Sequence, residues 1–190
     1  MELAKDPEKS HEANLLPQEI DRIRNLGGMI APILNQGHDI YEWRSGTTQI
    51  RQNCRGTSET FAQAYLYLKD HMNGRPIALG TDFNGMITAF GPRFGNDACP
   101  CGKTSNSVYP RTPYPFTSIL TNQMMDKSVM GAKFFDINED GLAHAGMLPD
   151  LIAELQTLGI SKTDLEPLMN GARGYIEMWE AAEAKAPGIR

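Results

Sequence analysis

Hydrophobic side chains recur at helical spacing in several stretches of this chain, and each stretch is bounded by residues typical of helix ends. We predict one helix between Pro17 and Gly27, because proline is favoured in a first turn and glycine at a C-terminus. We predict a second helix from Thr57 or Ser58 to Gly74, since hydroxyl side chains cap helix N-termini well. Both stretches place apolar residues on one side, which is the pattern of a helix packed against a core.

The C-terminal third contains three further segments with helical spacing. One begins at Pro149 and stops at Gly159. Ser161 caps the next segment, with an acid three residues later in an arrangement close to a capping box. The last helix carries these apolar residues on one side: Tyr175, Met178, Trp179 and Ala182. We interpret Tyr175 and Trp179 as core residues of that terminal helix.

Two short, uninterrupted apolar runs alternate with the first two helices, at residues 29–34 and 76–80. Such runs are typical of strands buried on both faces, although Pro32 removes one backbone donor from the first. Helix, strand, helix and strand with short connections indicate the α/β class and parallel strands. The remaining expectations are a polar loop at 35–56, a short helix at 116–127 and a small strand at 134–138.

The chain has 190 residues, which is the length of one domain. We predict a loose N-terminal segment at 1–14 and a single α/β domain at 15–190. Within this domain, residues 84–115 contain four glycines and five prolines and follow neither helical nor strand spacing. We therefore expect a long loop there, of the kind that is either functional or disordered.

Charge and hydropathy exclude several classes of protein. The formal net charge of -5 argues against a nucleic-acid-binding protein, which presents a basic face. No run of about 18 apolar residues exists and the first residues lack an apolar core, so we expect no membrane span and no secretory signal. Cys54 and the Cys99/Cys101 pair are too few for a secreted disulfide scaffold. We interpret them as reduced thiols of a cytoplasmic protein, with the role of the Cys99/Cys101 pair left open.

The strongest candidate for chemistry is Asp82, which directly follows the second apolar run. Ligands bind beyond the carboxyl ends of parallel strands, and barrel enzymes take catalytic residues from these ends. An aspartate there can accept a proton or hold an ammonium group; the alternative is an aspartate that only caps a turn. His144 lies between small residues that allow a ligand to approach closely, and histidine carries protons near neutral pH. The alternative for His144 is a hydrogen-bonded structural residue.

Three other patterns favour structural interpretations. Residues 136–141 imitate a calcium loop, but Met147 stands where that loop needs a bidentate glutamate, so we prefer a polar turn. Ser58 opens a helix without the glycine spacing and preceding strand of a hydrolase nucleophile, so we interpret it as a capping residue. The histidine spacings match no metal motif, and we predict no metal site from this chain alone.

One stretch of the sequence resembles a known strand end. It reads IALGTDFNG over residues 77–85, close to the GSDFDG strand end of the renal (membrane) dipeptidase family of metal-dependent amidohydrolases. Residues 16–30 resemble the helix and strand that precede this motif, and residues 140–159 resemble the family's C-terminal helices. The resemblance covers most of residues 15–182, yet only the last third of a family barrel. It implies a helix-rich, partial TIM-barrel-like fold, made of the C-terminal strands and helices of a (β/α)8 barrel.

The resemblance also implies roles for individual residues. Asp82 takes the position of the aspartate that faces the family's active site and handles the substrate's amine or a proton, which implies a catalytic Asp82. Asn84 stands where the family usually has a second aspartate, which puts any role needing that charge in doubt. We assign Asn84 and His144 to substrate binding. The family's metal ligands have no counterpart here, so zinc is implied only if missing strands are supplied elsewhere.

A barrel needs eight strands and about 250 residues. Three arrangements therefore stay open: a fragment of a longer enzyme, a second chain that completes the barrel, or a homo-oligomer that buries its own edges. We predict the C-terminal segment of a dipeptidase-like amidohydrolase, which hydrolyses peptide, amide or ester bonds of small-molecule substrates. The alternatives are a non-catalytic oligomeric remnant or binding module, and a metal-independent esterase that uses Ser58 and His144.

Overall fold

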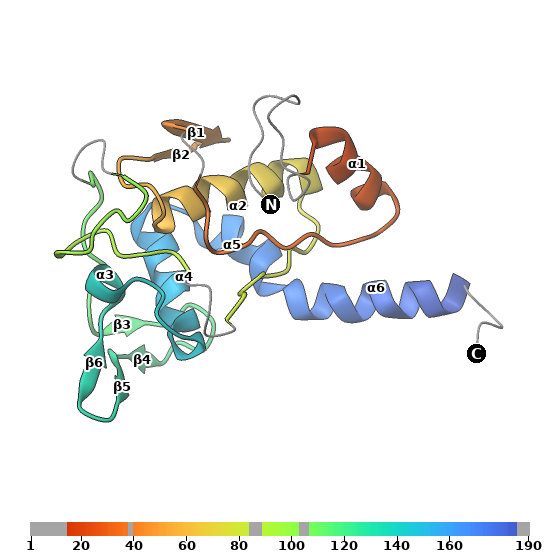
Figure 1. Cartoon of the computed structure of the whole chain (residues 1–190). Helices are drawn as coiled ribbons and strands as arrows, with labels where there is room; N and C mark the ends of the chain where they lie inside the picture. Colours follow the sequence, from red (N-terminus) through yellow and green to blue (C-terminus); the bar gives the residue numbers. More distant parts are fainter. Residues whose placement is uncertain (1–14, 38–39, 84–88, 103–106, 186–190) are drawn as a thin grey trace.

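The computed structural model describes residues 15–37, 40–83, 89–102 and 107–185, and within these it is a mixture of helices and small antiparallel sheets (Figure 1). The N-terminal elements are α1 (Pro17–Asn25), β1 (Glu42–Ser45), β2 (Thr48–Arg51) and α2 (Ser58–Met72). The middle of the chain forms β3 (Phe116–Thr117), β4 (Met124–Met125), β5 (Ser128–Met130) and β6 (Lys133–Phe135). The C-terminal elements are α3 (Ile137–Asp140), η2 (Ala145–Met147), α4 (Leu148–Thr157), α5 (Lys162–Met169) and α6 (Gly171–Lys185).

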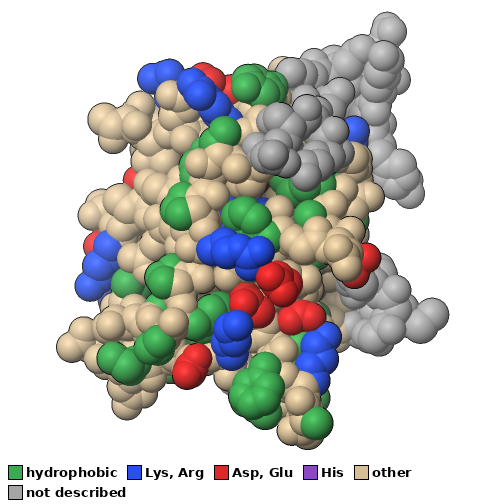
Figure 2. Space-filling model, turned by 90° about the vertical axis from the view of Figure 1, so that its left-hand side faces the viewer, with side chains coloured by type: hydrophobic (Ala, Val, Ile, Leu, Met, Phe, Trp, Pro, Cys, Tyr) green, Lys and Arg blue, Asp and Glu red, His purple; other side chains and the backbone are tan. Residues whose placement is uncertain are grey.

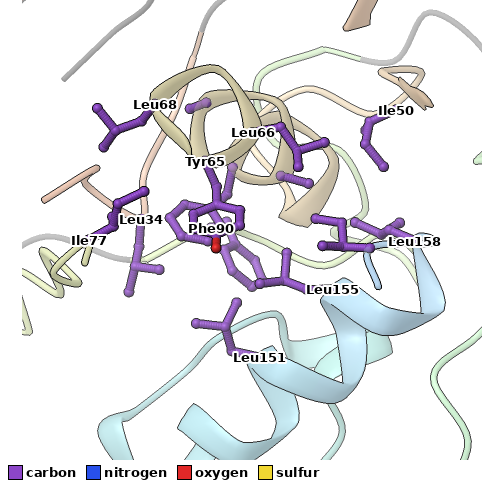
Figure 3. Close-up of a cluster of buried hydrophobic side chains, with 14 of the residues drawn as sticks. Leu34, Ile50, Tyr65, Leu66, Leu68, Ile77, Phe90, Leu151, Leu155 and Leu158 are labelled. Carbon is purple, nitrogen blue, oxygen red and sulfur yellow. The ribbon is translucent and has the colours of Figure 1, made fainter. Parts of the chain in front are cut away.

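Helix α2 is the centre of the molecule. It packs against α1, the β1–β2 hairpin, α4 and α5, and its side chains are buried in every turn. Figure 3 shows Tyr65 of α2 and Phe90 between this helix and α4, with Leu151 and Leu155 approaching from the α4 side. Of the two predicted caps, Thr57 caps α2, because its hydroxyl accepts a hydrogen bond from the backbone N–H of Glu59. The interpretation of Ser58 as the capping residue was wrong, since its hydroxyl donates to Glu154 instead.

The two apolar runs lie side by side and parallel, as expected, but they do not form continuous strands. The backbone N–H of Ala78 donates to Ile30 O (3.0 Å), and that of Leu34 donates to Gly80 O (3.2 Å). Ile33 and Gly80 form a parallel bridge. The pairing stays irregular because Pro32 has no N–H to offer. Within the described residues the sheets are two-stranded and antiparallel and do not close into a barrel, so the partial TIM barrel is not established by them.

Within the described residues, the two faces of the parallel pair are covered to different extents. Ile30, Leu34 and Ile77 are buried in the core beneath α2, whereas Ala31 and Ile33 on the other face are half-buried. Parallel sheets are ordinarily covered on both faces, and their residues are accordingly apolar throughout. The alternation therefore marks a face with apolar side chains that the described residues do not fully cover.

The helix predictions for α1, α2, α4 and α5 are confirmed, including the cap at Ser161, whose hydroxyl accepts from the backbone N–H of Asp164. The polar loop predicted at 35–56 was wrong, because it contains the β1–β2 hairpin with Trp43 paired opposite Ile50. The helix predicted at 116–127 was also wrong. A turn with Asn122 in the left-handed region (φ 55°) joins β3 to β4 there, a conformation that breaks a helix.

The interpretation of Tyr175 and Trp179 of α6 as core residues was wrong. Tyr175 is 53% exposed and Trp179 is 55% exposed, and the buried residues of the helix are Gly171 and Gly174. A Cβ atom on Gly174 would lie 2.3 Å from the Pro76 side chain, so the backbone of the first turn packs directly on the body. From there α6 extends away from the rest of the protein toward the C-terminus (Figure 1).

The interpretation of the cysteines as reduced thiols is also corrected. Cys54 and Cys99 form a disulfide across 45 residues of sequence, while Cys101 is free and exposed. The two loops meet because the backbone N–H of Gly91 donates to Gly56 O at 2.7 Å and Thr57 forms a parallel bridge with Gly91. The Cys99/Cys101 pair is thus not a bonded unit. Among the described helices, none combines the length and apolar character needed to cross a membrane.

Candidate functional site

A pocket of about 550 Å³ lies at the carboxyl ends of the two parallel segments. Asn35, which follows the first segment, and Phe83, which follows the second, both line it. The other walls come from Gly56, from the loop at 89–101, and from the end of α3 and the chain after it, through Asp140, Leu142 and Ala143. This is the position at which α/β proteins bind ligands, since the connections leaving parallel strands gather there. We call it the carboxyl-end pocket.

The carboxyl-end pocket is acidic. Asp97, Asp140 and the thiol of Cys101 line it, and its described lining residues include neither lysine nor arginine. Asp140 is held in place, because Oδ2 accepts the backbone N–H of Asp136 at 2.9 Å and Oδ1 lies 2.7 Å from Lys133 Nζ. Because Lys133 neutralises Asp140, the net negative charge of the described lining comes from Asp97, and a carboxylate in a concave site favours a cationic ligand group over an anionic one.

Two glycines let the walls of this pocket come together. Gly141 has φ 64°, and a Cβ atom there would lie 2.6 Å from the carbonyl oxygen of Phe90. Gly56 has φ 74°, and its Cβ would lie 2.6 Å from Sγ of Cys101. A larger residue at either position would strain the backbone and push a wall outward. The shape of the pocket therefore depends on residues that carry no chemistry themselves.

The chain segments that contain Asp82 and His144 lie next to this pocket, but neither side chain lines it. Asp82 is exposed, lies in the left-handed region at φ 49°, and precedes Phe83, which lines the pocket. His144 follows Ala143, another lining residue. Asn84, the third predicted site residue, lies outside the described residues.

His144 has clear structural contacts. Its Nδ1 accepts the backbone N–H of Gly146 at 3.1 Å and so caps η2, and its ring meets the ring of Phe135 edge to face at 4.6 Å. Its Nε2 is buried and finds no hydrogen-bond partner among the described residues. The structural interpretation of His144 thus accounts for one ring nitrogen and leaves the other as a buried polar atom without a partner among the described residues.

Sequence reasoning missed the polar residues that do line the pocket. Asn35 follows an apolar run just as Asp82 does, so the argument that singled out Asp82 applies equally to Asn35. Asp97 and Cys101 carried no such signal, because they sit in a loop without periodicity. The disulfide at Cys99 and the bridge at Gly91 bring that loop to the pocket.

Behind the pocket lies a buried ionic network around Glu154. Arg93 Nε donates to Glu154 Oε1 at 2.5 Å and Arg93 Nη2 donates to Oε2 at 3.1 Å, with both side chains 1% exposed. Ser58 Oγ donates to the same carboxylate at 2.6 Å, and Thr112 also donates to it. The network links α2, α4 and the loop at 89–112. Ser58 is fully buried in it, which is a packing position and not that of an accessible nucleophile.

A second buried carboxylate, Glu59, holds the chain before α2. Its Oε2 accepts the backbone N–H groups of Asn53 (2.6 Å) and Cys54 (2.9 Å). Burial raises the pKa of Glu59, although these hydrogen bonds oppose the shift. Asp150 is similar, because burial raises the pKa of its carboxyl group even though Tyr114 donates a hydrogen bond to it. Glu59 thus holds loop backbone and Asp150 holds the Tyr114 hydroxyl, and neither residue lines the carboxyl-end pocket.

The segment that imitates a calcium loop has its carboxylates occupied. Asp136 caps α3 by accepting the N–H of Asn138 at 2.9 Å and pairs with Lys127 at 2.8 Å. Burial opposes the shift, but Lys127 and Asn138 together lower the pKa of Asp136. The predicted polar turn is a short capped helix.

On the face drawn in Figure 2, acidic and basic side chains lie next to one another, with hydrophobic side chains among them.

The described residues do not fit a zinc site. Within them, no three histidine, cysteine, aspartate or glutamate side chains come together in a group that could hold a metal ion. A structural or catalytic zinc needs three or four such ligands. We therefore derive no chemical step through a metal.

A second hollow, of about 450 Å³, lies between the β3–β4 hairpin, α4 and the α5–α6 junction. Its walls are mainly apolar, with these large residues: Phe116, Ile119, Leu120, Ile152 and Leu168. The described lining residues include no acid or base. The carboxyl-end pocket is therefore the better candidate for chemistry.

Comparison with known proteins finds no relative of this chain. No protein-family model matches the chain, and no significant similarity to a curated protein or to a solved structure was found. The functional conclusion therefore depends on the pocket and on the residues around it.

Proposed function

We propose that this chain is part of a dipeptidase-like hydrolase of the (β/α)8 barrel type, and that the carboxyl-end pocket is its contribution to the substrate site. The observation that carries the proposal is the parallel bridge between Ile33 and Gly80, with the pocket at the carboxyl ends of both segments. Barrel enzymes place their active sites at this end of their strands. The reaction is the hydrolysis of a peptide, amide or ester bond in a small-molecule substrate.

The half-buried face of the parallel pair supports the idea of an incomplete barrel. In a barrel, the face that carries Ala31 and Ile33 would point to the interior, opposite the face that packs beneath α2. The missing strands would come from a longer polypeptide, from a second chain or from a second copy. Zinc ligands, which the dipeptidase-like class implies, would then come from those strands too.

The acidic lining supports a substrate with a free amino group. Asp97 would attract its ammonium group, and Asp82 at the rim would hold that group or accept a proton. Asn84 and His144, which are next in sequence to the lining residues Phe83 and Ala143, would bind the substrate's polar groups. The scissile bond would then lie toward the strands that complete the barrel.

Binding is tested by titrating the full chain with a dipeptide that has a free amino terminus and with its N-acetylated form. The free-amine form is expected to bind more tightly, and Asp97→Asn is expected to weaken only that form. Asp126→Asn, an exposed aspartate on the β4–β5 connection, is the matched control. Equal binding of both forms, or an Asp97→Asn variant that binds like the wild type, would contradict the proposal.

Turnover separates the hydrolase from its alternatives. In the assembly that completes the barrel, Asp82→Asn should abolish the hydrolysis of the dipeptide that the wild type carries out, whereas a non-catalytic remnant or binding module would bind the peptide without turnover in any variant. The esterase alternative predicts covalent labelling of Ser58 by a serine-directed reagent. Its complete burial against Glu154 argues against this outcome.

A further inference from the structure

Helix α6 presents three large hydrophobic side chains to solvent. Tyr175, Ile176 and Trp179 are 53%, 57% and 55% exposed, and the first two turns touch the body through glycine backbone. In Figure 1 the helix runs outward from α5 with the rest of the described structure near its first turns only. Exposed groups of aromatic and aliphatic side chains on one element mark interaction sites.

These side chains lie on one side of the helix. At 3.6 residues per turn, Ala172, Tyr175, Ile176 and Trp179 share one face, and Tyr175 and Trp179 have ring centroids 6.4 Å apart. A helix of 15 residues is marginal in water by itself and is stabilised mainly by the packing of its apolar face. The face therefore fits against another helix.

The charges on α6 indicate what kind of surface its apolar face binds. Arg173 lies in the first turn, Glu177, Glu180 and Glu183 follow along the helix, and Lys185 of the last turn lies on the side away from Ile176 and Trp179. Helices that bind membrane surfaces are basic on their polar face, so this acidic helix does not suit a lipid surface. A basic start and an acidic continuation make the helix complementary to a reversed copy of itself.

We propose that α6 pairs antiparallel with α6 of a second copy of this chain. In the register that sets Ile176 opposite Trp179 of the partner subunit, Arg173 comes within one turn of Glu180 of the partner subunit and of Glu183 of the partner subunit. Two-fold symmetry repeats each of these contacts. Tryptophan and tyrosine at the centre are the residue types that dominate binding at interfaces.

The length of α6 sets the expected affinity of the proposed dimer. A helix of 15 residues is about 22 Å long, so an α6 pair lies at the low end of the interface areas of specific complexes. We expect dissociation in the micromolar range, visible as a concentration-dependent mass. This inference does not depend on the proposed hydrolase function.

Sedimentation of the full chain over a range of concentrations tests the pairing. The wild type is expected to change from monomer to dimer, and Trp179→Glu should weaken association at least tenfold with its helical circular dichroism unchanged. Phe134→Glu, on β6 and 67% exposed, is the matched control and should leave the dimer intact. A monomer at all concentrations, or a dimer that survives Trp179→Glu, would overturn the proposal.

Charge exchange tests the antiparallel register. Arg173→Glu and the double variant Glu180→Arg/Glu183→Arg each place like charges together in the proposed pair, so each should weaken its own dimer. An equimolar mixture of the two variants restores opposite charges at both ends and should form a heterodimer as stable as the wild-type dimer. Variants that were merely misfolded would not recover on mixing, and the absence of recovery would reject this register.

Discussion

Helices α2 and α6 have the same length, 15 residues, and opposite surroundings. Helix α2 is buried continuously from Ser58 to Leu66, including the polar residues of its first turn, and again at Leu68 and Met72, whereas α6 buries only Gly171 and Gly174. Both carry apolar residues at helical spacing. The periodicity thus identifies the apolar face of each helix. Whether that face packs against the rest of the chain or against a partner is determined by the tertiary structure.

The same contrast holds for charged groups. Next to α2, Arg93 and Glu154 form a pair with both side chains 1% exposed, and Ser58 bonds to the same carboxylate. On α6, Arg173 and Glu177 form a pair at 2.7 Å with side chains 79% and 56% exposed. Solvent screens the second pair and not the first, so the two should differ greatly in their effect on folding.

The largest effect is expected from Glu154→Ala. This substitution leaves the guanidinium of Arg93 buried without its counterion and removes the acceptor of Ser58, at a cost of roughly 3–5 kcal/mol in the free energy of unfolding. Glu177→Ala on α6 should cost less than about 1 kcal/mol. Urea unfolding of both variants measures the difference. Equal losses would mean that the two environments are not as different as the structure describes.

The disulfide beside α2 should also contribute strongly. Cys54 and Cys99 close a loop of 45 residues, which in the chain-entropy description stabilises the fold by about 4 kcal/mol. Replacement of both by serine should lower the unfolding midpoint, whereas Cys101→Ser should not. A thiol titration of the native protein should find one reactive thiol per chain. Three would contradict the assigned pairing.

A matched pair of apolar truncations compares the helices directly. Leu66→Ala removes a fully buried side chain of α2 and should cost about 2–5 kcal/mol. Ile176→Ala removes a side chain of α6 that is 57% exposed, and should change the stability of the dilute protein by no more than about 0.5 kcal/mol. Measured instead at concentrations where the proposed dimer forms, Ile176→Ala should be clearly destabilising.

The sequence was sufficient where local signals decide the structure. The cap at Thr57, the cap at Ser161 and the prolines at the helix starts predicted the helices, because these groups act on backbone within one turn. The parallel neighbourhood of residues 29–34 and 76–80 was predictable from their apolar runs. The strand-end argument pointed to the end of that pair at which the carboxyl-end pocket lies, and the functional role of this end stays a prediction.

Non-local contacts account for what the sequence did not reveal. The β1–β2 hairpin depends on Trp43 packing edge-on against Tyr67 of α2 at 5.1 Å, a contact that a local pattern of polar residues conceals. Cys54 bonds Cys99 because the bridge between Thr57 and Gly91 joins their loops. Asp97 reaches the pocket on the same loop. Each of these pairings spans more than 20 residues of sequence, beyond the reach of periodicity.

The smallest expected effect is on how stability depends on pH. This dependence has opposite signs for one carboxyl of α2 and for another that contacts this helix. Burial raises the pKa of Glu59, so its folded state binds the proton more tightly than the unfolded state does. Its contribution to stability is present below the unfolded pKa, near 4, and is lost as the pH rises through the folded pKa. Relative to Glu59→Gln, the wild type should lose stability over that range, by no more than about 1.4 kcal/mol per pH unit.

Asp164 is the control of opposite sign. Burial opposes the shift, but Lys69 of α2, at 2.6 Å, together with Ser161 lowers the pKa of Asp164. Its contribution is therefore present above the unfolded pKa and is lost as the pH falls through the folded value. Urea unfolding between pH 3 and pH 7 should show the wild type losing stability relative to Glu59→Gln as pH rises and gaining it relative to Asp164→Asn. Two differences of the same sign would show that one of these carboxyls does not have the surroundings described, since burial and a lysine act on a carboxylate in opposite directions.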